Sequence, residues 1–286
     1  MEERNERGET LQEFLDQYDE NRYRRGSNTV DMILFTELNG KLKVLLVKRK
    51  DHPFIHDWAM PGGFVNFDED LDTAVKRELE EETNLSDSTY FRQLYTFGNA
   101  DRDPRTRVIT TVYLSMTSSE NIKRTSAGDD AMDTGWFTVQ KVTSSTDGHQ
   151  RNSILMLDDE AKDIHICYEI IDRAKDNYVQ TRSKLLESSN AKLAADHIKA
   201  INMAIDVVRN RAASTGIMFN LLPKECTLRH IQKVYEAIVN HPVDTANFRR
   251  DIKKMLVPTG KTTLVNGRRV STYTFNPLLP FIKETL

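Results

Sequence analysis

The sequence predicts an α/β (α+β) protein of two domains, and three observations support this prediction. The chain has 286 residues, which is more than one ordinary domain needs. Strand-like and helix-like segments are mixed as far as residue 222, whereas residues 223–286 have the pattern of two short helices and a hairpin. The charge divides at the same place, with a net charge of −9 on residues 1–222 and +6 on the remainder. We therefore expect an acidic body followed by a small basic domain suited to a polyanion.

The composition is that of a globular protein in a reducing compartment. Hydrophobic residues make up 38% of the chain and charged residues 29%, which excludes a collagen-like or largely disordered chain. Apolar runs are too short to cross a bilayer, and the charged N-terminus differs from an apolar signal peptide. Cys167 and Cys226 are far apart in sequence, outside the spacing of a thiolate zinc site. We expect a cytoplasmic protein with no membrane partner.

Hydrophobic periodicity indicates the elements of the first domain. Residues 9–24 have the spacing of a short amphipathic helix within an N-terminal segment, residues 1–26. The domain itself is expected over residues 27–222, with an insert at about 143–190. An Asn-Gly turn joins its first two strands. The expected strands are 29–36, 41–48, 90–97, 107–116 and 134–139, the expected helices are 70–84 and 191–213, and 153–157 and 164–170 pair as a hairpin within the insert.

Residues 223–286 have the outline of a winged helix-turn-helix domain. Thr227 is a suitable N-cap for a helix over 228–240, a second helix is expected over 245–256, and an Asn-Gly turn closes a hairpin over 264–270. Basic side chains on the second helix and at the hairpin tip would contact DNA phosphates and base edges. The alternative is a basic face on a domain that only dimerises. The candidate nucleic-acid-binding residues are Arg249, Arg250, Lys253, Lys254, Arg268 and Arg269.

Three carboxylates converge at one end of the helix that follows the glycine-rich loop. Glu78 lies three residues before Glu81 and four before Glu82, so all three project from one helix face. Like charges one turn apart repel each other, and hard cations such as Mg²⁺ or Mn²⁺ remove this cost by binding clustered carboxylate oxygens. The plainer alternative is an acidic helix face in solvent. Glu69 and Arg77, at fixed spacing between the loop and the carboxylates, favour the metal site.

The stretch from Gly63 to Leu85 resembles the signature of the Nudix hydrolases, Gly-x5-Glu-x7-Arg-Glu-U-x-Glu-Glu-x-Gly-U, where U is aliphatic. Asn84 stands where the family has glycine. A glycine there is expected at a left-handed helix C-cap, where Asn is the next best residue, so the change is conformationally conservative. The matching residues are Gly63, Glu69, Arg77, Glu78, Leu79, Glu81, Glu82 and Leu85.

The Nudix resemblance implies a fold, a reaction and roles for individual residues. The implied fold is an α/β/α sandwich with a mixed sheet. The implied reaction is the metal-dependent hydrolysis of a nucleoside diphosphate linked to another group, in which bound metal ions activate water and clamp the phosphate oxygens. Glu69 and Arg77 would hold the architecture of the loop and helix. The implied catalytic and metal-binding residues are Glu78, Glu81 and Glu82, with the backbone carbonyl of Gly63 as a further metal ligand.

A charged loop after the helix supplies cations. Arg102, Arg105 and Arg107 precede a predicted strand and are candidates for binding the substrate phosphates, the alternative being a solvated charged loop. Residues 127–131 (AGDDA) form an acidic turn that would either add a carboxylate to the site or cap a turn.

A second resemblance covers the C-terminal part of the chain. Residues 222–250 and Tyr273-Thr-Phe275 resemble the Nudix-related transcriptional regulators of NAD metabolism, as do residues 101–105, residues 127–131 and Asp196-His197. Proteins of this group are typically homodimers in which the Nudix domain senses a nucleotide such as ADP-ribose. Their winged domain binds an operator, so this resemblance implies operator DNA as a partner.

Three functions fit these observations. The first is a Mg-dependent Nudix pyrophosphohydrolase acting on a nucleoside diphosphate derivative, with ADP-ribose or a related dinucleotide as the expected substrate. The second is a DNA-binding transcriptional regulator of NAD or sugar metabolism that uses the Nudix domain as an effector sensor. The third is an enzyme whose C-terminal domain only dimerises. Because a pure sensor has no need of all three carboxylates, the sequence favours hydrolysis by a homodimer.

Overall fold

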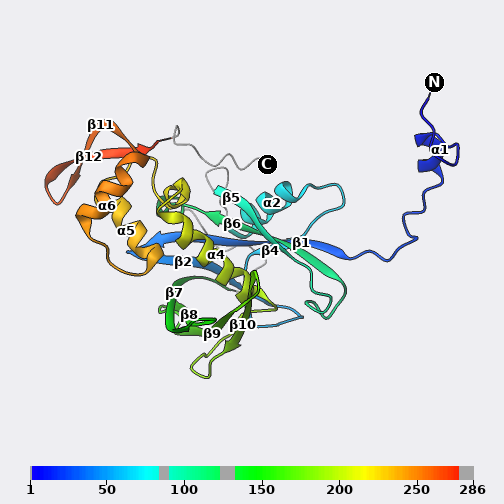
Figure 1. Ribbon diagram of the computed structural model, residues 1–286, viewed down its shortest axis with the longest axis horizontal. Helices are drawn as coiled ribbons and strands as arrows, with labels where there is room; N and C mark the ends of the chain where they lie inside the picture. Colours follow the sequence, from blue (N-terminus) through cyan, green and yellow to red (C-terminus); the bar gives the residue numbers. More distant parts are fainter. Residues whose placement is uncertain (1, 84–89, 123–132, 277–286) are drawn as a thin grey trace.

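The fold is built on a mixed sheet (Figure 1). The computed structural model describes residues 2–83, 90–122 and 133–276. The sheet strands are β1 (Ser27–Leu38), β2 (Lys41–Lys48), β3 (Trp58–Ala59), β4 (Gly62–Phe64), β5 (Tyr90–Phe97), β6 (Val108–Met116), β7 (Asp133–Asp147), β8 (Gln150–Asp159), β9 (Ile164–Lys175) and β10 (Tyr178–Leu185). Their order is β10-β9-β8-β7-β2-β1-β6-β5, with β3 beside β2 and β4 beside β1. Strands β1 and β6 run parallel, and the other described pairs are antiparallel. The predicted mixed sheet is confirmed.

The first hairpin lies in the middle of the sheet. Asn39 and Gly40, between β1 and β2, have φ angles of 55° and 77°. Both values lie in the left-handed region, where Asn-Gly is the preferred pair for a two-residue hairpin turn. Strand β1 is flanked by β2 and β6, and its residues 30–36 are all buried. Its position in the sheet explains why residues 32–35 of this strand are all apolar.

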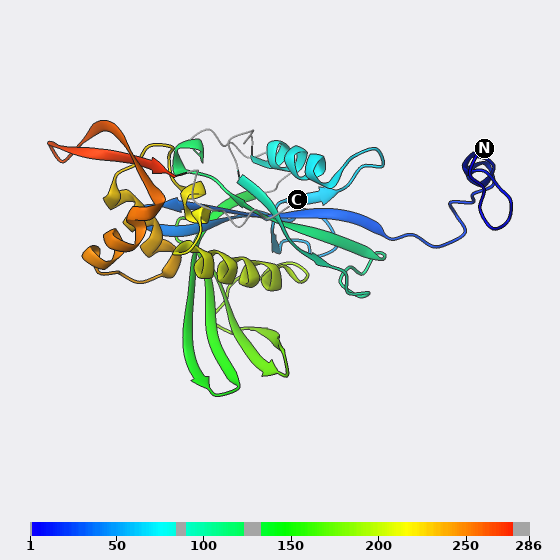
Figure 2. The same cartoon turned by 45° about the horizontal axis from the view of Figure 1, so that its top comes forward.

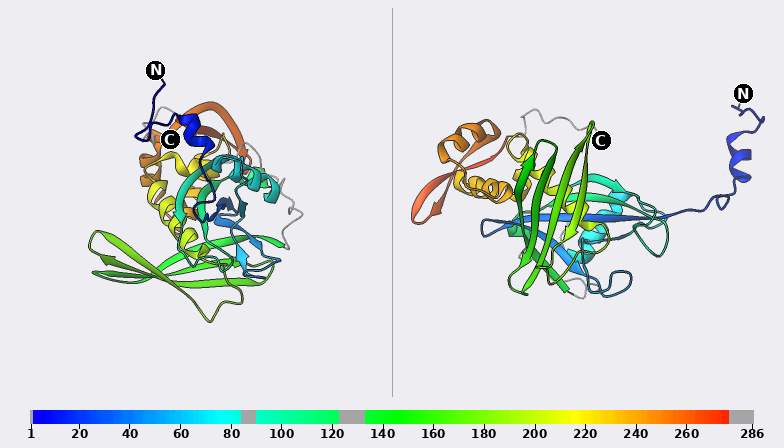
Figure 3. Two further views of the ribbon diagram at one scale, coloured as in Figure 1. Left: turned by 90° about the vertical axis from the view of Figure 1, so that its right-hand side faces the viewer. Right: turned by 60° about the horizontal axis from the view of Figure 1, so that its bottom comes forward.

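The stretch expected as an insert belongs to the sheet. Strands β7, β8, β9 and β10 are successive antiparallel neighbours that extend away from the rest of the molecule (Figure 2) and lie side by side (Figure 3). The hairpin predicted over 153–157 and 164–170 is present within the longer strands β8 and β9. The far end of β7, residues 142–147, is exposed. Polar, solvated strand ends carry no burial pattern, which is why the sequence predicts shorter strands.

One helix covers each face of the central sheet. Helix α2 (Leu71–Thr83) buries Ala74, Val75 and Leu79 in a cluster with alternate residues of β1, among them Met32. Helix α4 (His197–Ala212) packs on the other face, in a cluster that includes Phe35. Successive side chains of β1 thus point to opposite faces of the sheet and pack against α2 and α4 in turn. The predicted sandwich of helices around a mixed sheet is confirmed.

Helix α4 begins later than the sequence predicts. The backbone N–H of Trp58 donates to the carbonyl of Lys192 at 3.0 Å, and the N–H of Ala194 donates to the carbonyl of Trp58 at 2.8 Å. Residues 191–196 therefore lie along strand β3 and leave the helix to start at His197. Long-range backbone pairing of this kind overrides the helical propensity of the alanines.

The N-terminal helix is short and lies apart from the rest of the structure (Figure 1). Helix α1 (Leu11–Asp16) begins with a capping box made by Thr10 and Glu13, and none of its residues is buried. The helix predicted over 9–24 is thus wrong in length. Asp19 accepts a bond from the backbone N–H of Asn21 at 2.9 Å, and such a local side-chain bond competes with helix continuation.

The C-terminal domain has the predicted winged-helix elements. Thr227 caps α5 by accepting from the N–H of His230, and α6 begins after the cap Asp244. Asn266 and Gly267 have φ angles of 48° and 76° and form the hairpin turn. The helix predicted over 245–256 divides into α6 and a 3-10 turn. The elements are η1 (Gly216–Leu221), α5 (Leu228–Val239), α6 (Thr245–Ile252), η2 (Lys253–Met255), β11 (Leu256–Val265) and β12 (Arg268–Phe275), and a short helix α3 (Ser119–Ile122) follows β6 in the first domain.

The two parts of the chain share a hydrophobic core. One buried cluster contains Phe35 of β1, Ile205 of α4, and Ile231 and Ile238 of α5. Burying an aliphatic side chain of this size contributes about 1.5–3 kcal/mol, so the winged domain is packed against the first domain rather than tethered to it. Among the described helices, none combines the length and the apolar character needed to cross a membrane.

Candidate functional site

The glycine-rich loop brings the chain close to the carboxylate helix. Strand β4 pairs with β1, with Gly62 opposite Asp31 and Gly63 opposite Val30. A Cβ atom on Gly63 would lie 2.2 Å from Oε1 of Glu78, and a Cβ on Gly62 would lie 2.2 Å from the carbonyl oxygen of Val30. At Gly62 the clash is with backbone and φ is 153°, so only glycine fits, whereas a side chain at Gly63 would displace the Glu78 carboxylate. The glycines therefore let the Glu78 carboxylate lie directly against the loop backbone.

Arg77 connects the loop to the carboxylates of α2. Its Nε and Nη2 donate to the two oxygens of Glu69 at 2.8 and 2.9 Å, a bidentate pair. Its Nη1 donates to Glu78 at 2.7 Å and to Glu81 at 3.1 Å, and Nη2 also reaches the carbonyl of Phe64 at 3.1 Å. The ion pair that the eight-residue spacing of Glu69 and Arg77 predicts is present, and the same guanidinium orients two further carboxylates.

These contacts shift the ionisation of Glu69 and Arg77 in opposite directions. The hydrogen bonds from Arg77, and then that from the backbone N–H of Asn66, lower the pKa of Glu69 to about 2. The bonds to Glu69, followed by those to Glu78, raise the pKa of Arg77. Both groups stay charged at neutral pH, so the loop remains pinned to the helix.

Glu78 and Glu82 are in surroundings that disfavour their charged forms. Burial, partly offset by Arg77, raises the pKa of Glu78. Burial and the charge of Glu78 raise the pKa of Glu82 to about 8, although the backbone of Gly62 hydrogen-bonds to this carboxylate. The Oε2 atom of Glu82 is buried without a hydrogen-bond partner among the described residues. A buried, unpartnered carboxylate oxygen beside other acids is the environment that a cation would stabilise.

The residues therefore fit a divalent cation, but the predicted trio is not gathered equally. Glu78 is 11% exposed at its side chain and Glu81 is 58% exposed. In the described ranges, no three His, Cys, Asp or Glu side chains are already close enough to hold a metal ion. Glu78 and Glu82, with Glu81 and the carbonyl of Gly63, are the groups that would hold Mg²⁺ or Mn²⁺.

A buried charge network that the sequence does not predict adjoins Glu82. Asp31 on β1 is buried, accepts from Oγ1 of Thr110 at 2.6 Å, and its negative charge raises the pKa of Glu82. Nη2 of Arg102 lies 3.8 Å from Asp31 and donates to Asp196 at 3.0 Å. The available signal was a single acid within the apolar strand at 29–36, which is costly unless it is paired.

The three arginines proposed for substrate phosphates have different surroundings. Arg102 is only 6% exposed at its side chain and is engaged with Asp196. Arg105 forms a bidentate pair with Asp103 and lies 5.5 Å from the ring centroid of Phe64 on β4. Arg107 is exposed and its side chain passes close to Gly26. Of these, Arg105 is the one that contacts the glycine-rich strand.

His197 closes the network at the start of α4. It is buried, and its Nδ1 accepts from the backbone N–H of Met60, one residue before Pro61, at 2.9 Å. Burial lowers the pKa of this imidazole, despite the nearby charges of Asp31 and Asp196. A neutral His197 therefore fixes the entry to the glycine-rich loop, and Asp196 beside it links α4 to Arg102.

The basic side chains of the winged domain form a second candidate interface, and all six are exposed. Arg250 pairs with its neighbour Asp251 at 3.0 Å. For the other five, no acidic partner occurs within the described part of the chain. This set, which we call the basic face, comprises Arg249, Arg250, Lys253, Lys254, Arg268 and Arg269 on α6, η2 and the start of β12.

Some predicted features lie outside the described residues. These are Asn84 and Leu85 at the end of the Nudix-like signature and the acidic turn at 127–131.

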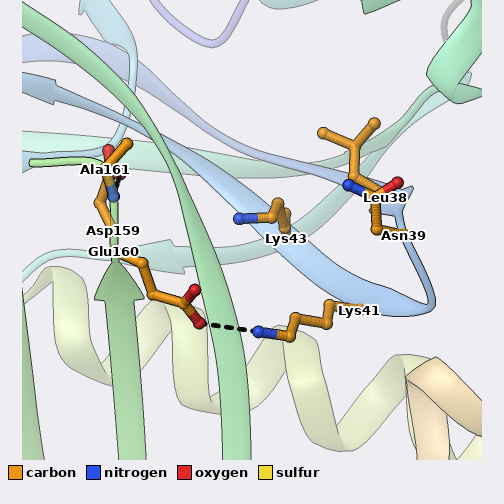
Figure 4. Close-up of a pocket in the computed structure, with 7 residues that line it drawn as sticks. All are labelled: Leu38, Asn39, Lys41, Lys43, Asp159, Glu160 and Ala161. Carbon is orange, nitrogen blue, oxygen red and sulfur yellow. Dashed lines mark hydrogen bonds and ion pairs between the residues drawn. The ribbon is translucent and has the colours of Figure 1, made fainter.

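A separate hollow between the β1–β2 turn and the β8–β9 turn contains none of the predicted site residues (Figure 4). It measures about 450 Å³, and Lys41 donates to Glu160 across it at 2.7 Å. Lys43 donates to the carbonyl of Trp136 at 3.0 Å, and burial lowers the pKa of this amine. Its charges are engaged with one another or with the backbone, so we assign no function to it.

Comparison with known proteins identifies both parts of the chain. The NUDIX domain family matches residues 27–158, and the NrtR DNA-binding winged helix domain matches residues 218–275. The ADPR responsive transcriptional repressor NtrR of Acinetobacter baylyi is 27% identical over 261 residues, which are 90% of this chain and 85% of the repressor. These matches confirm the predicted Nudix domain and winged-helix domain.

Two solved structures extend the likeness to almost the whole chain. The MutT/nudix family protein from Enterococcus faecalis is 30% identical, with a TM-score of 0.69 and coverage of 95% of each chain. Shewanella oneidensis NrtR complexed with a 27mer DNA is 27% identical, with a TM-score of 0.60 and coverage of 87% of this chain and 93% of that one.

Proposed function

The chain belongs to the MutT/Nudix family and ends in an NrtR-type winged helix, and from this premise we propose that it is an ADP-ribose-responsive, DNA-binding transcriptional regulator. In this proposal the winged domain binds operator DNA and the Nudix domain senses ADP-ribose or a related nucleoside diphosphate derivative. The full-length similarity to a repressor described as ADPR-responsive favours this function over hydrolysis alone.

The basic face is the observation that carries the DNA-binding part of the proposal. Six cationic side chains are exposed on one helix, the turn after it and a hairpin tip, while residues 1–222 have a net charge of −9. Five of the six have no acidic partner among the described residues and are available to neutralise phosphates, and the arrangement suits helix and wing contacts to a duplex. A similar chain, NrtR from Shewanella oneidensis, has been crystallised with DNA.

The surroundings of Glu78 and Glu82 support a nucleotide-sensing Nudix domain. A bound Mg²⁺ or Mn²⁺ ion would supply the positive charge that lets acidic side chains accept an anionic diphosphate. Arg77 keeps Glu78 oriented, and Arg105 beside Phe64 offers a cation at the rim of the loop. We extend the proposal to a homodimer in the cytoplasm.

The proposal is tested by a gel shift of the full-length protein with DNA from upstream of its own gene. Binding should weaken at least tenfold in Arg249→Ala and in Arg268→Ala, because each removes a phosphate contact from the basic face. The control is Lys184→Ala, which removes an equally exposed cation from β10. ADP-ribose should change the affinity at least fivefold, the lower end of ordinary allosteric coupling. Binding that ignores both arginine variants and ADP-ribose would refute the proposal.

Retained hydrolysis is a second candidate function, favoured by the buried carboxylate oxygen of Glu82. Hydrolysis of ADP-ribose adds water to one phosphorus and breaks its bond to the bridging oxygen, so the products are AMP and ribose 5-phosphate. Incubation of the purified protein with Mg²⁺ and ADP-ribose, followed by chromatography for AMP, tests this function. Release of AMP that disappears in Glu82→Gln would support it. Absence of AMP, with DNA binding intact, would leave the Nudix domain as a sensor only.

A further inference from the structure

A large cavity lies where the two domains meet, away from the carboxylate helix. It measures about 780 Å³. Its walls come from strand β5, from the end of α4 and residues 214–224 after it, and from η2 and β12 of the winged domain. This volume is typical of sites for small molecules, which often lie between domains. A molecule bound here would touch both the Nudix sheet and the DNA-binding domain.

The cavity is cationic. Arg92 on β5, Arg211 on α4, Lys224 in the connecting segment and Lys254 on η2 all line it, and no Asp or Glu occurs among the described lining residues. This contrasts with the net charge of −9 on residues 1–222, to which two of these bases belong. Arg92 and Arg211 are also engaged in other interactions, so the positive charge open to a ligand comes from the exposed Lys224 and Lys254, and it favours an anionic ligand.

The same cavity presents aromatic rings. Phe219 and Phe275 line it with their ring centroids 4.8 Å apart and their planes at 43°. Gly216 makes this possible, because a Cβ at that position would lie 2.5 Å from the Phe275 ring. Tyr90 of β5 also lines the cavity, and burial raises the pKa of its hydroxyl. Aromatic walls beside cations suit a ligand that joins a ring to an acidic group.

We propose that this junction cavity is a second ligand site, distinct from the Nudix site, that binds an anion carrying an aromatic ring. Mononucleotides and aromatic acids have this chemistry. Lys254 belongs to both the cavity and the basic face, so an anion bound here would reduce the positive charge available to DNA. The proposal does not depend on hydrolysis or on the response to ADP-ribose, because none of its residues lies on α2 or β4.

The site can be tested with 8-anilinonaphthalene-1-sulfonate, whose aromatic rings carry a sulfonate and whose fluorescence rises in apolar surroundings. Titration of the full-length protein should give saturable binding of one molecule per chain. The double variant Lys224→Glu/Lys254→Glu should weaken binding at least tenfold. Both lysines are exposed, so the change reverses charge without disturbing the core.

The matched control is Lys184→Glu/Lys199→Glu, which reverses two exposed lysines on β10 and α4 that do not line the cavity. Its affinity for the probe should stay within twofold of the wild type. Equal weakening in both double variants would indicate a general charge effect and overturn the proposal. Wild-type affinity in the Lys224→Glu/Lys254→Glu variant would overturn it as well.

Discussion

The carboxylate end of α2 and the basic face of the winged domain hold charge in opposite ways. Around α2, a single guanidinium binds Glu69, Glu78 and Glu81 at 2.7–3.1 Å, and the Oε2 atom of Glu82 is buried. On the basic face, the side chains are exposed, and only Arg250 has an acidic partner within the described residues. The charges around α2 form ion pairs within the protein, whereas those of the basic face are exposed to solvent.

This difference separates recognition of a small ligand from recognition of a polymer. Buried and oriented charges present a fixed site and are weakly screened by salt. Exposed cations are hydrated until a polyanion displaces the counterions, so their contribution depends on ionic strength. Each region should therefore respond to a different perturbation.

The largest effect is expected for Glu82→Gln on any hydrolysis of ADP-ribose. Removing a buried ligand charge from a metal site should lower turnover about a thousandfold, because metal charge stabilisation supplies several kcal/mol. Rates of AMP release measure the effect. Glu80→Gln, on the exposed side of the same helix, is the control and should stay within twofold. Equal activity in both variants would remove Glu82 from the site, and unchanged DNA binding by nucleotide-free Glu82→Gln would show that this carboxylate is not part of the DNA interface.

The second-largest expected effect is that salt weakens DNA binding far more than it weakens ADP-ribose binding. If the six cations of the basic face contact phosphates, raising salt from about 50 to 200 mM should weaken DNA binding about 10³-fold. Arg249→Ala should reduce the slope of log affinity against log salt by about one. Binding of ADP-ribose, measured calorimetrically over the same range, should change far less. Equal salt slopes for the two ligands would contradict this difference between the two regions.

Replacing an arginine should lower the free energy of unfolding beside α2 but not on the basic face. Arg77→Ala leaves Glu69 and Glu78 without their shared partner, and Arg77 is 27% exposed at its side chain. Allowing for that exposure, we expect a loss of about 2 kcal/mol in the free energy of unfolding. Arg249→Ala, on the exposed face, should change it by less than about 0.5 kcal/mol. Urea unfolding of both variants makes the comparison, and similar losses would contradict it.

A smaller, pH-dependent effect is expected for metal-free protein. The pKa of Glu82 in the folded protein is about 8, above the ordinary value of 4.5. Between these values the folded state retains a proton that the unfolded state has lost, so this group makes stability fall as the pH rises from 5 to 8. Glu82→Gln removes this effect. The free energy of unfolding of the variant, relative to that of the wild type, should therefore rise by about 1–3 kcal/mol between pH 5 and pH 8. Urea unfolding at the two pH values, with Glu80→Gln as control, measures it. A constant difference between Glu82→Gln and wild type would contradict the assigned burial.

Local signals predicted much of this molecule, and long-range contacts account for what they missed. The Asn-Gly turns, the Thr227 cap and the spacing from Glu69 to Arg77 act over a few residues, so each could be found in the sequence. The late start of α4 depends on pairing with Trp58, which is distant in sequence. The exposed ends of β7 and β10 lack the burial pattern that marks a strand.

In the candidate site, too, local spacing predicted some residues and long-range contacts determine the others. Glu78, Glu81 and Glu82 follow from helical spacing alone. The network of Asp31, Thr110 and Asp196 does not, because three elements far apart in the chain bring these side chains together. Arg102 was expected to face solvent and phosphates, yet Asp196 and Asp31 surround it in the interior. The charge pattern of the sequence shows that Arg102 is a cation, but it does not show which acidic side chains lie beside it.

In the function proposed above, one chain couples nucleotide binding in the Nudix domain to DNA binding by the winged domain. Thermodynamic linkage makes such coupling reciprocal, so it can be measured from either ligand. The most direct test is the calorimetric affinity of full-length protein for ADP-ribose, alone and saturated with operator DNA. We predict that the two dissociation constants differ at least fivefold, by the same factor with which ADP-ribose changes DNA affinity. Identical dissociation constants in the free protein and the DNA complex would contradict the claim.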